Sequence, residues 1–233
     1  DYAVFGEPSG ITNVTIAYKG RIAINLRINV GDSAHASAPW LARNAIEESM
    51  KFTTELKKAL EENQEGKSKG MMLTATITEI KGGDSHNVTP KECNTIMDIR
   101  IPVTLNCKAV GEKIATKVAE LASEQQVEAL YSVIDETEPF EAPMNSPLVR
   151  AFTLGVMDVE HKRPALIRKT GTGDMNIIGT LWNVPVVTYG PGDPHASHTI
   201  DERVSMNEYL RGIEVIRNTL QHLKRLHDAK TEN

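Results

Sequence analysis

Hydrophobic and polar residues alternate near the start of the chain in the way expected of β-strands. Residues 14–18 and 21–30 both show a period of two, and the dipeptide Lys19-Gly20 lies between them. Two alternating runs joined by a short glycine-containing turn are typical of an antiparallel hairpin. We therefore expect a hairpin here, preceded by a short strand in the apolar and aromatic run of residues 1–5.

A helical period comes next. Pro39 stands where the first turn of a helix tolerates proline, and apolar residues then recur at spacings near 3.6. These residues, which would share one buried face, are Leu41, Ala45, Phe52, Leu56 and Ala59. Further along, the pattern predicts strands over 71–80, 93–103 and 127–134 and a helix over 110–123.

The order of elements from Arg21 to Ile134 is βαββαβ, which is the split βαβ arrangement of ferredoxin-like domains. A segment of this length can bury its own hydrophobic core. We therefore expect an inserted domain over residues 19–137, which separates residues 1–18 from residues 138–233 of a second domain.

The remaining sequence alternates helices and strands. The periods predict helices over 147–156 and 174–182, strands over 164–169 and 184–189, and a long final helix from Ser205. That helix begins with a capping-box pattern, and its apolar positions are Tyr209, Ile213, Ile216, Leu220 and Leu223. Such alternation is typical of a parallel sheet. The predicted fold class is therefore α/β, with a ferredoxin-like domain inserted into a parallel-sheet domain.

Composition and charge narrow the classes of protein. The 233 residues include 26 Lys and Arg against 31 Asp and Glu, a net charge of -5, and 40% are hydrophobic. These values exclude a disordered chain and argue against a nucleic-acid partner. No apolar run approaches the roughly 20 residues of a membrane helix, so we expect no membrane association. Cys93 and Cys107 form no CxxC pair, and we expect buried, reduced thiols in a cytoplasmic protein.

Glu7 and His198 are the first candidates for chemistry. Glu7 directly follows the first strand and precedes Pro8, so its carboxylate would stand at the carboxyl end of a strand, where α/β sheets bind ligands. His198 lies in a long Gly- and Pro-rich loop, and such loops often carry function. A solvated turn glutamate and a surface histidine are the ordinary alternatives. His195 could pair with His198 at a metal, but one Glu and one His cannot hold a catalytic zinc alone.

Three further candidates lie in the expected inserted domain. His35 is in a small-residue loop before the first helix, where it could meet an anion or serve as a helix cap. Asn87 precedes a predicted strand, and Arg100 lies within that strand. The guanidinium of Arg100 offers two parallel donors to a carboxylate, although an exposed strand arginine is the more common finding.

The segment from Lys169 to Asn176 joins a predicted strand to a predicted helix and contains Gly171, Thr172 and Gly173. It superficially resembles a phosphate loop but does not fit the GxxxxGK[ST] pattern. A phosphate-binding enzyme that uses residues 171–173 is therefore a weak alternative, which protection by nucleotides would test.

Taken together, these motifs resemble one family of zinc-dependent hydrolases, the group of acetylornithine deacetylase, succinyl-diaminopimelate desuccinylase, aminoacylase and carboxypeptidase G. The sequence around Glu7, Lys169 and His198 is most similar to that of the branch that releases lysine or ornithine from an amino-group carrier protein. The motifs that carry the resemblance are Gly6-Glu7-Pro8-Ser9-Gly10, Tyr18-Lys19-Gly20-Arg21, the His35 segment, Asn87-Val88-Thr89-Pro90, the 171–176 turn, Tyr189-Gly190-Pro191-Gly192 and Ser197-His198-Thr199.

The resemblance implies a metal-dependent amidohydrolase of lysine or arginine biosynthesis. Its cofactor would be zinc, two ions per complete site, with cobalt as a substitute. Glu7 would be a ligand of one ion and His198 a ligand of the other. The two metals would polarise an amide carbonyl and lower the pKa of a bridging water.

The resemblance also implies roles for the other candidates. His35 would act in catalysis by reaching the site of a neighbouring subunit, where it would face the developing oxyanion. Asn87 and Arg100 would hold the carboxylate or carbonyl of the substrate. Further contacts to the substrate would come from Lys169, Gly171 and Thr172.

One part of the family's sequence is missing from this chain. Family members carry, before the part that matches, a His-x-Asp segment, a bridging Asp and a Glu-Glu pair that supplies the general base. We therefore expect the chain to be an incomplete fragment that is inactive alone. By resemblance, it would form a homodimer through the inserted domain and act on an N-acyl amino acid or an amino-group carrier protein. A non-catalytic dimerisation or small-molecule-binding module is the alternative.

Overall fold

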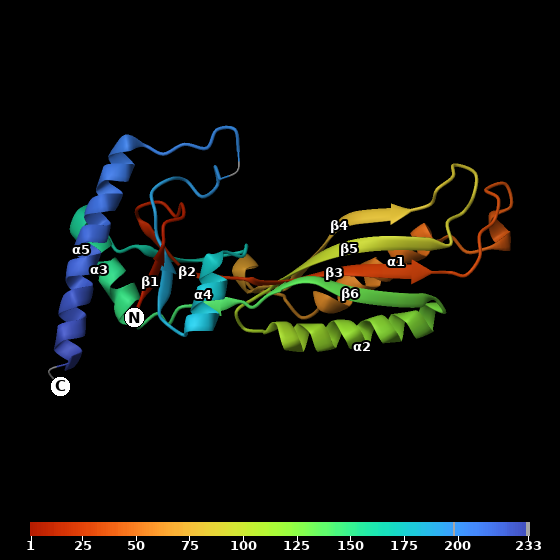
Figure 1. The fold of residues 1–233 in the computed structure, drawn as a ribbon, viewed down its shortest axis with the longest axis horizontal. Helices are drawn as coiled ribbons and strands as arrows, with labels where there is room; N and C mark the ends of the chain where they lie inside the picture. The colour runs from red at the N-terminus through yellow and green to blue at the C-terminus, as the bar shows by residue number, and fades with distance from the viewer. Residues whose placement is uncertain (198, 232–233) are drawn as a thin grey trace. The chain divides into compact units, whose positions relative to one another are not determined.

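The computed structural model describes residues 1–197 and 199–231 (Figure 1). Contacts between Cα atoms divide the chain into two compact units. Unit 1 consists of Asp1–Lys19 and Phe140–Asn233, and unit 2 is the continuous segment Gly20–Pro139. Each unit has its own β-sheet.

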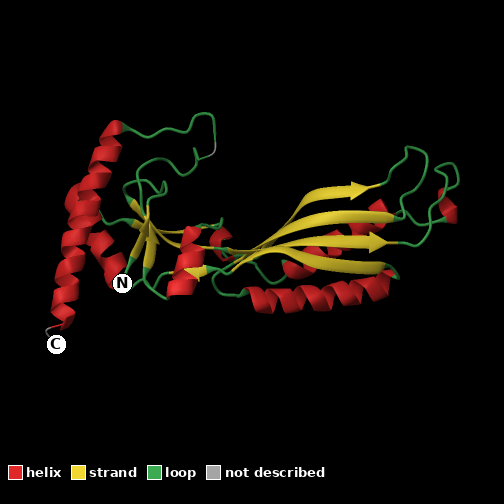
Figure 2. Cartoon of the chain, in the orientation of Figure 1, coloured by secondary structure: helices red, strands yellow, loops and turns green. Residues whose placement is uncertain are grey.

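Unit 2 is an antiparallel four-stranded sheet with two helices on one face (Figure 2). The strand order is β4-β5-β3-β6, so the expected βαββαβ insertion of ferredoxin-like type is confirmed. In chain order the elements are β3 (Gly20–Asn29), a 3-10 turn (Pro39–Leu41), α1 (Ala45–Leu60), a second 3-10 turn (Lys69–Met71), β4 (Thr74–Gly82), β5 (Glu92–Ile101), α2 (Cys107–Gln125) and β6 (Glu128–Thr137).

The core of unit 2 lies between the sheet and its helices. Every second residue of β3 is buried, because successive side chains of a strand point to opposite faces. Cys93 and Cys107 are also buried, as expected. On the uncovered face, by contrast, charged side chains form pairs, such as Arg21 with Asp135. The core side chains include Ile22, Ile24, Leu26, Ile28, Phe52, Leu56, Met97, Ile114 and Leu121.

Unit 1 has a mixed five-stranded sheet. Strand β1 pairs parallel with β9, β2 pairs parallel with β8, and β7 pairs antiparallel with β2. A single antiparallel bridge between Thr15 and Thr188 joins β2 to β9. The α/β class is confirmed, but the sheet is not wholly parallel, because β2 runs opposite to β7 and β9. The elements are β1 (Ala3–Phe5), β2 (Asn13–Tyr18), β7 (Phe140–Glu141), α3 (Pro147–Glu160), β8 (Ala165–Lys169), α4 (Asp174–Trp182), β9 (Val186–Thr188) and α5 (Met206–Thr231).

The expected hairpin around Lys19-Gly20 is wrong. Strand β2 pairs with strands of unit 1, whereas β3 pairs with β5 and β6 of unit 2. The N–H of Lys19 donates to the carbonyl oxygen of Lys169 at 3.3 Å, so Lys19 still belongs to unit 1. Gly20 is required by close packing rather than by a turn, since a Cβ there would lie 2.6 Å from Thr137 O and from Pro139.

The face of the first helix differs from the expected one at Leu41. This residue lies in the 3-10 turn before α1 and is exposed. Helix α1 begins only at Ala45, because the side chain of Asn44 caps it by accepting a hydrogen bond from the N–H of Ile46 at 3.0 Å. The other expected members of the face are buried; they are Ala45, Phe52, Leu56 and Ala59.

Helix α5 buries a different face from the one that its apolar spacing predicts. Gly212, Val215 and Thr219 are buried. Helix α5 comes close to α3 because Gly155 has no side chain: a Cβ there would lie 2.9 Å from Thr219 N and from Val215 O. The two backbones are too close at this point for a larger residue in place of Gly155. Most of the expected apolar stripe is exposed instead, namely Tyr209, Ile213, Ile216 and Leu220. Over residues 1–197 and 199–231, no helix has both the length and the apolar character needed to cross a membrane.

Gly155→Ala should destabilise unit 1, because the added methyl group would push the backbones of α3 and α5 apart. Overpacking of this kind typically costs about 1–3 kcal/mol. Gly111 of α2 is the matched control, since a Cβ there would meet no described atom within 4 Å. Gly111→Ala should therefore stabilise the protein by about 0.5–1 kcal/mol. Chemical denaturation measures both changes, and a stabilising Gly155→Ala would contradict the packing of α3 on α5.

Candidate functional site

Glu7 stands at the carboxyl end of β1. Strands β1 and β9 are parallel there, and Pro8 prevents the strand from continuing. The Glu7 side chain is 38% exposed, and its Oε2 accepts a hydrogen bond from the Tyr18 hydroxyl at 2.6 Å. Glu7 is therefore more than a solvated turn residue, because one carboxylate oxygen is anchored while the side chain still reaches solvent.

Tyr18 is the last residue of β2 and is only 2% exposed. Its hydroxyl donates to Glu7 Oε2. Burial, together with the hydrogen bond and the charge of Glu7, raises the pKa of Tyr18 well above its ordinary value. The phenol therefore keeps its proton at neutral pH and acts as a donor to the carboxylate.

Lys169, at the end of β8, lies beside Tyr18 in the parallel pair of strands. Its Nζ donates to the carbonyl oxygen of Pro8 at 3.0 Å and lies 3.9 Å from Glu7 Oε2. The same nitrogen is 5.5 Å from the centroid of the Tyr18 ring. Burial lowers the pKa of Lys169, and the charge of Glu7 opposes that effect. The ammonium holds the Glu7-Pro8 turn in place, and its expected contact with a substrate stays a prediction.

The turn between β8 and α4 packs directly on Glu7 and Tyr18. The N–H of Gly173 donates to Asn176 Oδ1 at 2.9 Å, and Asn176 Nδ2 donates to the carbonyl oxygen of Lys19 at 3.1 Å. A Cβ on Gly173 would lie 3.1 Å from the Tyr18 ring and 3.3 Å from Glu7 Oε1. Because Gly173 has no side chain, the Glu7 carboxylate and the Tyr18 ring can pack closely against this turn.

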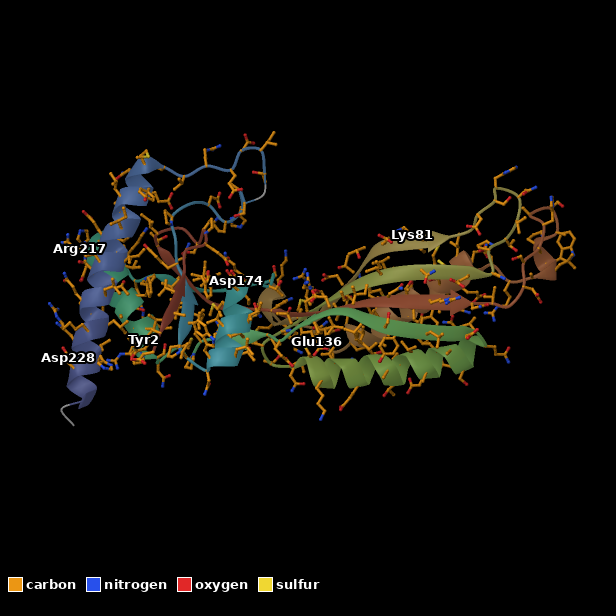
Figure 3. All side chains as sticks on the ribbon, viewed as in Figure 1. Tyr2, Lys81, Glu136, Asp174, Arg217 and Asp228 are labelled. Carbon is orange, nitrogen blue, oxygen red and sulfur yellow. The ribbon has the colours of Figure 1, made fainter. Side chains whose placement is uncertain are left out.

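The same turn is poorly suited to a phosphate. The Gly173 N–H, which a phosphate loop would offer to its ligand, is already bonded to Asn176. The carboxylate of Asp174, labelled in Figure 3, belongs to the first residue of α4 and would repel an anion. The structure therefore argues against the phosphate-binding alternative, and the contacts of Gly171 and Thr172 with a substrate stay predictions.

The loop that leads to His198 is anchored beside Glu7. The N–H of Ser9 donates to the carbonyl oxygen of Gly190 at 3.0 Å, and the N–H of Gly190 donates to the Ser9 hydroxyl at 3.1 Å. A Cβ on Gly190 would lie 2.7 Å from the carbonyl oxygen of Glu7, so only glycine lets the loop run so close. His198 itself lies outside the described residues, and its expected proximity to Glu7 stays a prediction.

His195 has a partner within its own loop. Its side chain is 93% exposed, and its Nδ1 lies 3.1 Å from Asp193 Oδ1. The backbone N–H of His195 donates to the same oxygen at 2.9 Å, and these contacts lower the pKa of Asp193. Both residues line a hollow of about 490 Å³ together with Arg203 and Glu208. This pairing accounts for His195 without a metal.

One group of three side chains able to bind a metal lies together among the described residues, in unit 2. It consists of Cys107, Glu136 and Glu138. Burial and the two glutamates raise the pKa of the Cys107 thiol to about 12, which favours the neutral thiol over the thiolate that a metal requires. The N–H of Cys107 donates to Glu138 Oε2 at 3.0 Å. These contacts indicate that the group supports the start of α2.

His35 and Asn87 lie together in unit 2. The N–H of Ala36 donates to the carbonyl oxygen of Asn87 at 2.8 Å, and His35 forms an isolated antiparallel bridge with Val88. The N–H of Ser37 donates to His35 Nδ1 at 3.2 Å. Because Nδ1 is an acceptor in that bond, the neutral ring carries its proton on Nε2. The His35 side chain is exposed and presents a donor to solvent.

Arg100 is far from Asn87 within the same unit. Asn87 precedes the start of β5 at Glu92, and Arg100 is next to the last residue of that strand. Eight residues of extended chain span about 26 Å. Arg100 forms two hydrogen bonds with Asp98, at 2.6 and 3.1 Å. Asn87 and Arg100 of one chain are therefore not brought together around a single carboxylate.

Tyr18 was not among the candidate residues from the sequence, and Gly173 was considered only as part of a possible phosphate loop. Tyr18 was visible only as a polar-tipped aromatic residue at the end of a strand, in the Tyr18-Lys19-Gly20-Arg21 motif. Its contact with Glu7 depends on the pairing of strands that are distant in sequence. No local pattern carries that information.

Comparison with known proteins identifies unit 2. Residues 16–126 match the model of the M20_dimer family, described as the peptidase dimerisation domain. The chain therefore contains an M20-type peptidase dimerisation domain. Outside that M20-type domain, residues 1–15 and 127–233 include Glu7 and the Lys169 turn.

Curated relatives extend the match to nearly the whole chain. The chain is 31% identical to a putative [LysW]-lysine/[LysW]-ornithine hydrolase of Thermococcus kodakarensis, over 96% of this chain and 56% of that protein. It is 29% identical to the [LysW]-lysine/[LysW]-ornithine hydrolase of Saccharolobus solfataricus, over 95% of this chain and 58% of the relative. The resemblance to this branch of hydrolases is confirmed. The chain spans less than two thirds of the length of either relative.

Solved structures of M20-type and related peptidases share the fold. The aminopeptidase PepT from Bacillus cereus aligns with a TM-score of 0.76 and 19% identity, over 96% of this chain and 57% of the other. An M20 family metallo-carboxypeptidase from Sulfolobus solfataricus aligns with a TM-score of 0.73 and 18% identity, over 95% and 63%. At this level of identity, the likeness establishes the fold.

Gly173→Ala should disturb the Glu7–Tyr18 pair and lower the stability of unit 1 by about 1–3 kcal/mol, the usual range for overpacking. The backbone itself does not forbid alanine, because φ at Gly173 is -153°. Gly171 is the matched control in the same turn, since a Cβ there would meet no described atom within 4 Å. Gly171→Ala should change stability by less than about 0.5 kcal/mol. Thermal melting of both variants checks the packing, and equal losses would contradict it.

Proposed function

We propose that this chain is part of a metal-dependent amidohydrolase that releases lysine or ornithine from an N-acyl or carrier-protein-linked precursor. The observation that carries the proposal is the carboxylate of Glu7, held by Tyr18 at the carboxyl end of β1. Ligand sites of α/β sheets lie at this end of the strands. The names of the relatives, which are hydrolases of LysW-linked lysine and ornithine, support the substrate class.

Residues 1–18 and 138–233 belong, in this proposal, to a catalytic domain, and residues 19–137 form its lid and dimerisation domain. An uncovered apolar surface of unit 1 supports the first assignment. Val4 of the outer strand β1 is 45% exposed, and Leu220 of α5 is 60% exposed. Both line an apolar hollow of about 390 Å³. A further part of the domain, present in the longer relatives, would cover this surface.

The metal in the proposed site is zinc, two ions per complete site, with cobalt as a substitute. Glu7 would bind one ion and His198 the other. Glu7 fits this role, because its Oε2 is held by a neutral donor and the bare Gly173 leaves room at Oε1. When bound, the metals would polarise the scissile carbonyl and activate water. The remaining ligands and the general base would come from the further part of the longer protein.

The residues of this chain would bind and orient the substrate. Gly171 and Thr172, in the turn before α4, would contact it, and Lys169 would add a positive charge beside Glu7. His35 would donate from Nε2 to the oxyanion that develops on the carbonyl, with Asn87 as its neighbour.

Arg100 would serve a different contact from that of Asn87. In a homodimer through unit 2, the His35–Asn87 end of one subunit would reach the metal site of its partner, while Arg100 would hold the substrate's carboxylate from the other subunit. The separation along β5 favours this division, because one chain cannot bring both groups to one small substrate. The protein would act in the cytoplasm, without nucleic-acid or membrane partners.

The rival proposal is a dimerisation or small-molecule-binding module without chemistry. Steady-state hydrolysis by the full-length protein, with and without a chelator, separates the two. Hydrolysis that is lost with the chelator and regained with zinc supports the enzyme, and no hydrolysis under any metal supports the module. Comparison of acetyl-lysine, acetylornithine, succinyl-diaminopimelate and the carrier-linked forms would then identify the substrate.

Action of His35 across the dimer can be tested by complementation in the full-length protein. His35→Ala should lower kcat by about 10²–10³-fold, because a positioned oxyanion donor is lost. Glu7→Ala should be inactive through loss of a metal ligand. Mixed subunits should regain about a quarter of the wild-type activity, since half of random dimers are hybrids with one complete site.

Each variant alone, incubated under the same exchange conditions, is the control for this complementation. Metal content should be normal in His35→Ala, and both variants should remain dimeric. If the mixture stays as inactive as its parents although subunit exchange is demonstrated, His35 acts within its own subunit or not at all.

A further inference from the structure

The hydrogen bond between Tyr18 and Glu7 has the geometry of a charge-assisted bond. Its length of 2.6 Å lies within the range of about 2.5–2.7 Å for a hydroxyl that donates to a carboxylate. The donor is buried and the acceptor reaches solvent, at 2% and 38% exposure. The bond therefore fixes one end of a carboxylate whose other end is accessible.

The direction of this bond follows from the chemistry of its two partners. A carboxylate accepts hydrogen bonds and a tyrosine hydroxyl has a single proton, so that proton points to Glu7. Strand β9 lies between the strands that lead to these two residues, and its Thr188 pairs with Phe5 of β1 and with Thr15 of β2. The bond therefore links two strands across a third.

The Tyr18 ring has little freedom to move away from Glu7. On β2 it pairs with Lys169 of β8 and with Phe140 of β7. A Cβ on Gly173 would lie 3.1 Å from the ring, so the turn before α4 closes one side. A donor that is fixed on both sides can hold a carboxylate in one orientation at little further entropic cost.

We propose that Tyr18 is a positioning residue for the metal ligand Glu7, which it holds by Oε2 so that Oε1 is presented to the cation. The inference rests on the proposed function, in which Glu7 binds one of two ions. It adds a residue that touches neither metal nor substrate and acts through Glu7. A mutation that removes the hydrogen-bond partner of a metal ligand typically lowers metal affinity by about 10–100-fold.

The test uses the full-length protein and measures metal binding directly. Zinc affinity is obtained by competition with a chromophoric chelator, and the absorption spectrum of the cobalt form reports the ligand geometry. Tyr18→Phe keeps the ring and removes the hydroxyl, and should weaken one of the two ions by about 10–100-fold and shift the cobalt spectrum. Tyr131→Phe in unit 2 is the matched control and should leave both readouts unchanged.

A second pair of variants separates positioning from a loss of fold. In a Glu7→Gln background, Tyr18→Phe should weaken zinc by less than about 2-fold, because the ligand through which it acts is already altered. Thermal melting of each variant shows whether the fold is kept.

The outcomes distinguish the positioning role of Tyr18 from the metal-binding role of Glu7. If Tyr18→Phe binds zinc as tightly as the wild type while Glu7→Gln binds weakly, Glu7 is a ligand and the role of Tyr18 is refuted. Equal losses from Tyr18→Phe in the wild-type and Glu7→Gln backgrounds would also refute it. If Glu7→Gln itself keeps wild-type affinity and spectrum, the proposed metal role of Glu7 fails.

Discussion

The hydrogen bond from Tyr18 to Glu7 joins the ends of two strands that do not pair with each other. Strand β1 delivers Glu7, β2 delivers Tyr18, and β9 lies between them in the sheet. Strand β9 is parallel to β1 and antiparallel to β2, so the bond links the side chains of two strands that run in opposite directions. Lys169 and Gly173 then close around the same carboxylate from the next connection.

Periodicity was enough to predict most of the elements and the core of unit 2. Phe52 and Leu56 lie on the buried face that their spacing indicated, because that helix covers one face of a single sheet. The same reasoning failed for α5, where Gly155 permits a close helix crossing and small residues are buried in place of the apolar stripe. It failed again at Gly20, which was expected in a hairpin turn. Glycine is needed there because a Cβ would lie 2.6 Å from Pro139. Contacts between distant segments decide both cases.

The candidate site shows the same limit. Glu7 could be selected from the sequence, because a carboxylate after a strand and before proline is a local pattern. Tyr18 could not, because its role arises only where β1, β9 and β2 meet in one sheet. His35 and Asn87 were chosen separately and lie together. Asn87 and Arg100 were expected to bind the same group of the substrate, but Asn87 precedes the start of β5 and Arg100 lies near its end. Sequence thus gives candidates, and strand pairing decides which of them can cooperate.

The nested arrangement of the two units has a consequence for the kinetics of folding. Unit 1 is built from segments that flank Gly20–Pro139, so its strand pairs join residues far apart in the chain. Such contacts are slow to form, because a long loop must close first. The first and last residues of unit 2 are neighbours, with Pro139 2.6 Å from a Cβ at Gly20. A unit 2 that folds early would close this loop and shorten the search by which β2 finds β7 and β8.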